Sequence, residues 1–170
     1  MKKNRNNCAF IDAANLHQGI ENLGWSLDYA RFRVFLKDKY SVSKAYIFIG
    51  LIPKNKDLYT KLQEAGFTLV FKEVIFDGEG KAKGNCDADL VLKAAQEAYE
   101  NAFEKAVIVS SDGDYSSLVK FLLSKNKLKA ILSPAMAKRC SILLKRTNAP
   151  IAYINDQRTV LEYPKRKSPR

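Results

Sequence analysis

Histidine and cysteine are scarce in this sequence, and several enzyme classes depend on them. The chain has one histidine, His17, and three widely spaced cysteines, Cys8, Cys86 and Cys140, with no CxxC pair. This set argues against a structural zinc site and against a disulfide framework. An enzyme of the Ser-His-Asp or Cys-His type would have to use His17. The glycine patterns GxGxxG and GxxxxGK(S/T) are also missing, which argues against the usual dinucleotide-binding fold and against an NTPase.

Long apolar runs are missing too. No run approaches the roughly 20 residues that a membrane-spanning helix needs. The amino-terminal part has no signal-peptide core, because only residues 8–11 are apolar in series before Asp12 interrupts them. Free cysteines are typical of a reducing compartment, where they are usually buried. We therefore expect a cytoplasmic protein that does not associate with a membrane.

Basic residues are abundant. Lys and Arg number 29 against 18 acidic residues, which gives a formal net charge of +11. A charge of this size favours anionic partners, among which nucleic acid leads. Composition alone is equally compatible with a highly soluble surface that binds no polyanion.

The order of the apolar segments indicates the fold class. Six short runs rich in β-branched or aromatic residues predict strands buried on both faces, at residues 8–11, 45–49, 68–74, 106–110, 129–132 and 151–154. Segments with helical spacing lie between them, at 28–40, 56–65, 87–103, 115–125 and 137–145. Alternating strands and helices predict a mainly parallel sheet with helices on both faces.

The chain length predicts one domain, over residues 1–160, followed by a flexible basic tail at 161–170. The tail holds four basic residues beside prolines, and a nucleic-acid contact or a sorting signal is the alternative to a solvated end. The longest loop, 76–86, holds three glycines and is predicted to be mobile.

Carboxylates stand at the ends of two predicted strands. Asp12 closes the first strand, and Asn15 follows it. Asp112 and Asp114 come directly after the fourth strand. Ligands of open α/β sheets bind beyond the carboxyl ends of the strands, so these side chains are candidates for a shared site. A purely local role, as helix caps or turn residues, is the alternative.

A third acidic stretch begins the helix predicted at 87–103. Asp87 shares a helical face with Leu90, which is the sheet-facing side, whereas Asp89 shares its face with Lys93. Asp87 is therefore expected to point inward. Asp89 is a reserve candidate, because the first turn of a helix can deviate from regular geometry. Favourable placement near a helix N-terminus is the alternative for both.

Three stretches of the chain also share a pattern with known proteins. They are residues 10–16 (FIDAANL), 83–90 (KGNCDADL) and 109–115 (VSSDGDY). In this order they resemble the motifs F-I-D-x-x-N-L, K-G-x-V-D-x-x-L and V-S-G-D-x-D-F of the NYN family of PIN-like nucleases, in its LabA-like branch. The order and spacing of the predicted strands and helices agree with that family over roughly residues 6–155.

The resemblance implies a three-layer α/β/α sandwich with a mainly parallel central sheet, PIN-like and Rossmann-like in type. It also implies an acidic cluster that binds Mg²⁺ or Mn²⁺ and cleaves RNA. Carried over by position, the metal-site candidates are Asp12, Asp87, Asp112 and Asp114, with Asn15 and Ser110 as supporting polar residues. The chain departs from the family pattern at Ala13, Cys86, Ser111 and Tyr115, and none of these departures removes an acid.

The resulting hypothesis is a Mg²⁺- or Mn²⁺-dependent endoribonuclease. Carboxylates suit these hard ions, which activate water and stabilise the leaving oxygen in phosphodiester cleavage. Asp12, Asp87 and Asp112 would hold one ion or share two. Asp114 would bind a second ion or orient the attacking water.

Four lysines are candidates for steering the RNA phosphates: Lys81 and Lys83 in the glycine-rich loop, and Lys54 and Lys56 after Pro53. The main rival is a non-catalytic module that binds RNA or a protein on the same fold. A haloacid-dehalogenase-like phosphatase is disfavoured, because its chemistry needs a second Asp where this chain has Ala14. A homodimer is a further candidate assembly, although no sequence feature indicates a dimer interface.

Overall fold

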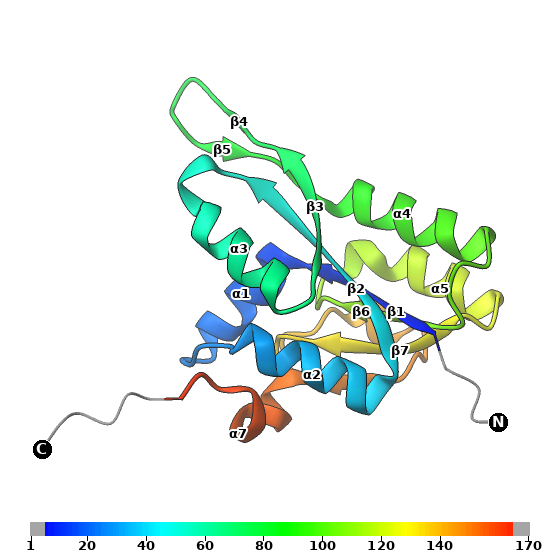
Figure 1. The fold of residues 1–170 in the computed structure, drawn as a ribbon. Helices are drawn as coiled ribbons and strands as arrows, with labels where there is room; N and C mark the ends of the chain where they lie inside the picture. The colour runs from blue at the N-terminus through cyan, green and yellow to red at the C-terminus, as the bar shows by residue number, and fades with distance from the viewer. Residues whose placement is uncertain (1–5, 165–170) are drawn as a thin grey trace, which may run out of the picture.

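The computed structural model describes residues 6–164, and a sheet of six parallel strands runs through its centre (Figure 1). The strands lie in the order β3-β2-β1-β6-β7-β8. Their bounds are β1 (Asn7–Asp12), β2 (Val42–Leu51), β3 (Thr68–Glu73), β6 (Ala106–Val109), β7 (Leu128–Ser133) and β8 (Ile151–Tyr153). The six predicted strands are confirmed, with ends that differ by a few residues.

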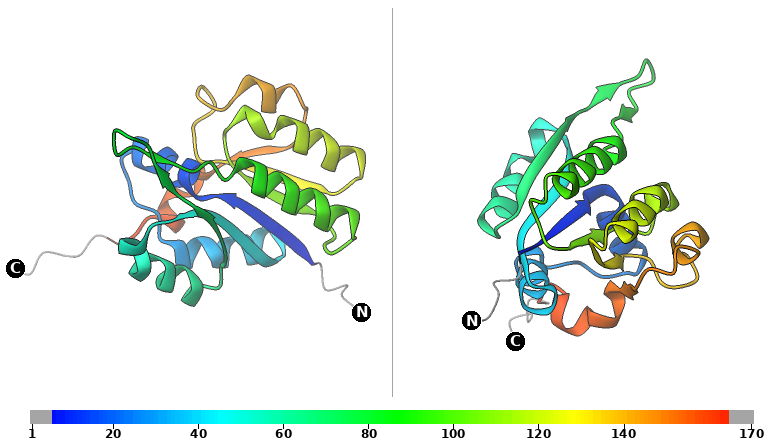
Figure 2. Two further views of the ribbon diagram at one scale, coloured as in Figure 1. Left: turned by 90° about the horizontal axis from the view of Figure 1, so that it is seen from above. Right: turned by 90° about the vertical axis from the view of Figure 1, so that its right-hand side faces the viewer.

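Helices cover both faces of the sheet (Figure 2). One face packs against α1 (Ala13–Asn22), α2 (Tyr29–Tyr40), α3 (Lys56–Glu64) and α7 (Arg158–Leu161), and the other against α4 (Asp87–Tyr99), α5 (Ser116–Ser124) and α6 (Ile142–Lys145). The central strand shows why two cores form. In β1, Ala9 and Ile11 point into one core, while Cys8 and Phe10 point into the other, and all four are buried. The predicted three-layer α/β/α arrangement is confirmed.

The direction in which the sheet grows reverses between β1 and β6. Strands β1, β2 and β3 extend it one way, whereas β6, β7 and β8 extend it the other way. Such a reversal leaves a crevice at the carboxyl ends of the two central strands, where ligands bind in this fold class. The last paired residues there are Ile11 and Val109, so Asp12 and Ser110 follow side by side.

The segment predicted to be a loop at 76–86 contains a β-hairpin. Strand β4 (Ile75–Phe76) pairs antiparallel with β5 (Ala82–Lys83), and this ribbon projects beyond the end of β3 (Figures 1 and 2). The side chain of Asp77 closes the turn, because its Oδ1 accepts hydrogen bonds from two backbone amides of that turn. The glycines obscured the short strands in the sequence.

Three other expectations need correction. Strand β3 is the edge of the sheet and is only partly buried. The helix expected over 87–103 ends at Tyr99, two residues before Asn101 takes a left-handed φ of 57°. The helix expected over 137–145 forms only as α6, where the Ser141 hydroxyl caps it by accepting a hydrogen bond from the Leu143 amide (3.2 Å). Three 3₁₀ helices also lie within residues 6–164: η1 (Pro53–Asn55), η2 (Gly113–Tyr115) and η3 (Ile154–Gln157).

The start of the predicted basic tail packs against the domain. Leu161 is fully buried, and Glu162 forms an isolated antiparallel bridge with Leu27. The packed part therefore runs past residue 160. The rest of the predicted tail, residues 165–170, lies outside the described residues. None of the helices within 6–164 combines the length and the apolar character needed to cross a membrane.

Candidate metal centre

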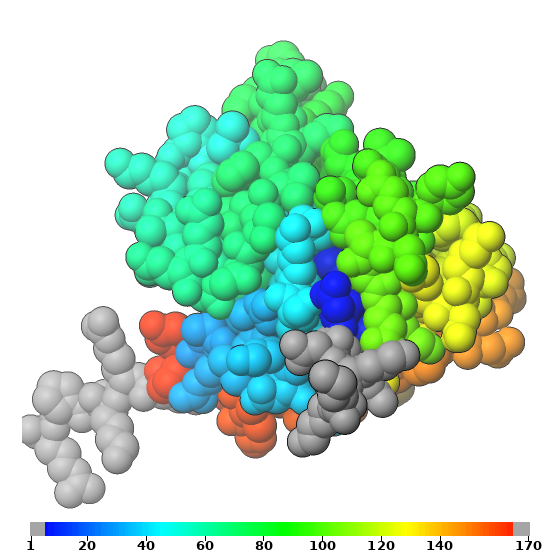
Figure 3. All heavy atoms as spheres, turned by 45° about the vertical axis from the view of Figure 1, so that its right-hand side comes forward, coloured from blue at the N-terminus to red at the C-terminus, as the bar shows by residue number. Residues whose placement is uncertain are grey.

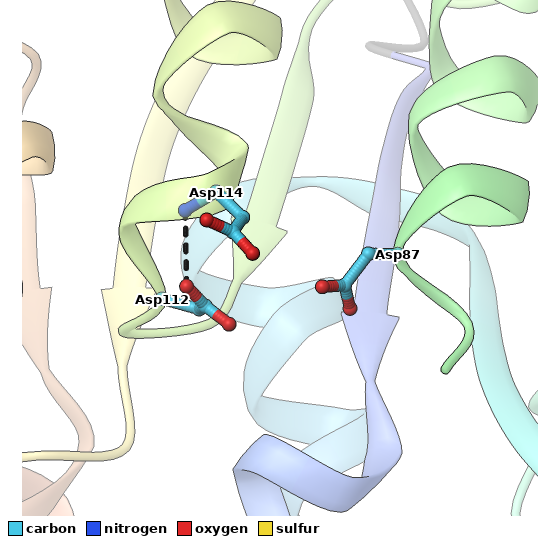
Figure 4. Close-up of side chains that lie close together, drawn as sticks. All are labelled: Asp87, Asp112 and Asp114. Carbon is cyan, nitrogen blue, oxygen red and sulfur yellow. Dashed lines mark hydrogen bonds between the residues drawn. The ribbon is translucent and has the colours of Figure 1, made fainter. Parts of the chain in front are cut away.

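Three carboxylates meet at the crevice between β1 and β6 (Figure 4). Asp87 begins α4, Asp112 follows β6, and Asp114 lies in η2. Each offers one oxygen, and these oxygens all lie within 4.8 Å of one another. The sequence separates Asp87 from the other two, and the parallel topology brings them together.

Local hydrogen bonds shape the loop that carries Asp112 and Asp114. The buried Ser110 hydroxyl accepts a hydrogen bond from the Asp112 amide (3.1 Å), and Asp112 Oδ1 accepts one from the Asp114 amide (3.0 Å). Gly113 permits this tight turn, because a Cβ there would clash with the side chain of Ser141. Ser110, predicted as a supporting polar residue, thus holds the loop that presents the acids.

Asn15 ties the start of α1 to the same loop. Its Oδ1 accepts hydrogen bonds from the Ser111 amide (2.9 Å) and from the Ser111 hydroxyl (3.2 Å). The serine at position 111, a departure from the family pattern, therefore contributes a contact that glycine lacks. Asn15 lines the crevice and fixes the relative position of the two strand ends.

Asp12 lies deeper than the other acids, with 7% of its surface exposed. Its Oδ1 caps α1 by accepting a hydrogen bond from the Asn15 amide (3.1 Å), and its Oδ2 accepts one from the Tyr115 hydroxyl (3.0 Å). Burial raises the pKa of the Asp12 carboxyl above its ordinary value, the two hydrogen bonds lower it, and the charges of Asp87 and Asp112 raise it further.

Tyr115 joins Asp12 to Asp87. The ring is fully buried, and its hydroxyl lies 3.0 Å from Asp12 Oδ2 and 2.7 Å from Asp87 Oδ1. Burial, followed by the charge of Asp12, raises the pKa of this phenol above its ordinary range, so it remains a donor. A phenol has one proton and can donate to only one of the two carboxylates. The two carboxylates therefore compete for one proton, and a further proton or a cation beside them would reduce their repulsion.

Asp12, Asp87, Asp112 and Asp114 together are called the carboxylate cluster below. The structure groups Asp87, Asp112 and Asp114, whereas Asp12, expected to share an ion with Asp87 and Asp112, is joined to Asp87 through Tyr115. A role as metal ligands stays a prediction for all four acids, and sequence reasoning did not identify the role of Tyr115. The available signal was the hydroxyl at a position where the family pattern has phenylalanine. The reserve candidate, Asp89, lies outside the cluster, because its carboxylate forms an ion pair with Lys72 (2.9 Å).

Asp12, Asp87 and Asp112 line a cleft of about 1230 Å³. Arg139, which sequence reasoning did not identify, is exposed and also lines it. Asn85 lies in the wall as well, and its amide donates a hydrogen bond to Asp87 Oδ2 (3.0 Å). The cleft therefore combines an anionic floor with at least one cationic side chain.

The lysines predicted to contact phosphates are all exposed, and none of them lines the cleft. Lys83 lies 3.7 Å from Asp77 as an ion pair. Lys54 and Lys56 flank Asn55, which does line the cleft. Seven of the 29 Lys and Arg residues belong to 1–5 and 165–170, so the described residues have 22 basic and 18 acidic side chains, a formal +4.

Comparison with protein-family models matches residues 8–147 to the NYN domain. A search of curated proteins finds no match for the chain. Among solved structures, the crystal structure of a protein of unknown function from Vibrio parahaemolyticus is similar, with a TM-score of 0.76 and 22% sequence identity. The match covers 95% of this chain and 99% of that one, and it supports the fold assignment alone.

Proposed function

Because the chain belongs to the NYN domain family, we propose that it is a metal-dependent ribonuclease that hydrolyses phosphodiester bonds at the carboxylate cluster. The observation that carries the proposal is the approach of three carboxylates to within 4.8 Å, beside a fourth that is buried. The family's resemblance to PIN-like nucleases supports the reaction class. Cleavage inside the RNA chain, rather than from an end, is part of the proposal.

The donor set fits a hard divalent cation. The group of Asp87, Asp112 and Asp114 offers oxygen ligands and contains no histidine or cysteine. Mg²⁺ and Mn²⁺ prefer oxygen ligands of this kind. Mutual repulsion of the anions, and the single proton of Tyr115 between two carboxylates, also favour a positive charge at this point.

Each residue of the site has a defined task in this proposal. A divalent ion held by Asp87, Asp112 and Asp114 would lower the pKa of an attacking water and stabilise the leaving oxygen. Asp114 is exposed, so its carboxylate can orient that water. Tyr115 keeps Asp87 and Asp12 in place, while Arg139 attracts a phosphate to the cleft.

The test is cleavage of a labelled circular RNA, because only an endonuclease opens a circle. The wild-type protein is expected to linearise it in Mn²⁺ or Mg²⁺ and not in EDTA. Asp112→Asn should slow cleavage by at least about 100-fold, the upper range seen when a residue that supports a metal site is lost. Asp38→Asn is the matched control, since Asp38 is exposed on α2 and does not line the cleft.

Two outcomes would contradict the proposal. Cleavage that survives Asp112→Asn would show that the activity belongs to another site or another protein. RNA that binds but is never cut, with either ion, would favour the alternative of a non-catalytic binding module.

A further inference from the structure

The β4–β5 hairpin forms one wall of the cleft. Val74, Ala82, Gly84 and Asn85 all line it, and they come from the hairpin or from its two junctions with the domain. In the space-filling view the segment from β3 to β5 rises above the rest of the surface (Figure 3). The hairpin is therefore an arm beside the carboxylate cluster.

The strand pairing tells which side chains share the cleft-facing side of the arm. Phe76 pairs with Ala82, and cross-strand partners point to the same face of a ribbon. Because Ala82 lines the cleft, its pairing partner Phe76 lies on the cleft-facing side of the arm, beyond the residues that line the cleft itself, and Phe76 is 60% exposed.

The opposite face of the arm has a different character. Ile75 pairs with Lys83, and Lys83 forms its ion pair with Asp77. The two large apolar side chains of the arm, Ile75 and Phe76, therefore point to opposite faces. A continuous apolar patch of the kind that buries a second protein copy would have them on one face.

Hydrogen bonds close the turn at the tip of the arm. Asp77 Oδ1 accepts hydrogen bonds from the amides of Glu79 (3.0 Å) and Lys81 (2.9 Å). Gly80 supplies the left-handed φ of 75° that the turn requires. These local contacts restrict the conformations of the turn, and a restricted segment loses less conformational freedom when it binds.

We propose that the arm binds the RNA substrate, with the ring of Phe76 stacked on an unpaired base. The sugar-phosphate backbone next to that base then lies along the carboxylate cluster. The inference rests on the proposed function for its ligand. Aromatic rings bind single strands by stacking on the exposed base face, which a duplex hides between neighbouring base pairs. The arm therefore selects unpaired RNA and sets the distance between the gripped base and the cleavage point.

The experiment separates grip from cleavage by measuring binding in EDTA. Fluorescence anisotropy measures the affinity of the full chain for a labelled single-stranded RNA of about 12 nucleotides and for the blunt duplex of the same sequence. The length is chosen because known single-strand-binding sites span ~4–16 nucleotides. Phe76→Ala should weaken single-strand binding about tenfold, the effect of losing one stacked base. Phe76→Trp should restore it, with quenching of the new indole on binding.

Ile75→Ala is the matched control. It removes an apolar side chain of the same hairpin that is 67% exposed, from the opposite face. Its affinity for single-stranded RNA should stay within about twofold of wild type, and duplex binding should be equally insensitive to both substitutions.

Three results would overturn the inference. The affinity for single-stranded RNA is unchanged in Phe76→Ala, or it falls equally in Phe76→Ala and Ile75→Ala. The third is a wild-type dimer in analytical ultracentrifugation that is monomeric in both variants. The outcomes also separate the two proposals. If the RNA binds through Phe76 but is never cut in Mn²⁺, the binding role of the arm is supported and the nuclease proposal is contradicted. If Phe76→Ala binds and cuts RNA like wild type, the nuclease proposal is supported and the binding role of the arm is contradicted.

Discussion

Replacing Tyr115 with phenylalanine deletes one hydroxyl and leaves the buried ring in place. That hydroxyl lies 3.0 Å from Asp12 Oδ2 and 2.7 Å from Asp87 Oδ1. After the substitution Asp12 keeps the hydrogen bond from the Asn15 amide but loses its partner at Oδ2. Leaving a buried group without its partner costs about 1–3 kcal/mol.

We expect a matching change in melting temperature. One kcal/mol corresponds to about 2–4 °C in a protein of 150–250 residues, so a loss of about 2 kcal/mol lowers Tm by about 4–8 °C in EDTA. In saturating Mn²⁺ the loss should be smaller, because a cation held by Asp87, Asp112 and Asp114 neutralises Asp87, one of the two carboxylates that the phenol contacts. Circular-dichroism melts of both proteins in both buffers provide the measurement.

Tyr99→Phe is the control for this substitution. It makes the same chemical change at a side chain on α4 that is 88% exposed, and it should leave Tm within about 2 °C of wild type. If Tyr115→Phe has the same Tm as wild type in EDTA, the hydroxyl does not stabilise the carboxylates. If its loss is equal with and without Mn²⁺, a cation does not take over the role of the phenol.

Two further predictions concern the cluster and its loop. Because the pKa of Asp12 is raised in the folded protein, the stability that this group contributes is fully present below its unfolded value of about 3.8 and is lost as pH rises through the folded pKa. In EDTA, the free energy of unfolding of Asp12→Asn should therefore rise relative to that of wild type as the pH goes from acid to neutral, as measured by urea titration. A difference between the two proteins that does not depend on pH would contradict this. Gly113→Ala should lower the free energy of unfolding by about 1–3 kcal/mol, because its Cβ meets Ser141. Gly78→Ala, which meets nothing within 4 Å, should be near neutral, and equal losses in the same titration would refute the clash.

The sequence predicted the layers of the fold because its local signals agree with the tertiary structure. The strand containing Phe10 and Ile11 is apolar on both faces, as a central strand between two helical layers must be. The β4–β5 hairpin was missed because each strand has two residues and glycines dominate the segment. Such a ribbon leaves almost no periodicity to detect.

The candidate site was predictable to the same extent. Acids at strand and helix ends were visible in the sequence, and helical spacing placed Asp87 rather than Asp89 toward the other acids. The spacing did not predict that Asp89 is half-buried and paired with Lys72 of β3. The link through Tyr115 was not, since a fully buried tyrosine after an acidic turn has the sequence signature of a core residue. Arg139 was missed because it lies in an irregular segment whose position depends on tertiary contacts.

The reversal of the sheet between β1 and β6 has a thermodynamic consequence. Asp12, Asp87 and Asp112 come from three distant stretches of sequence, so their mutual repulsion arises only when the chain folds. An ion that binds this arrangement has no comparable partner in the unfolded chain. For the metal site proposed above, each tenfold rise in the free concentration of the ion above its dissociation constant would add about 1.4 kcal/mol to the stability of the native state. The proposed nuclease would then be most resistant to unfolding under the ionic conditions in which it is active.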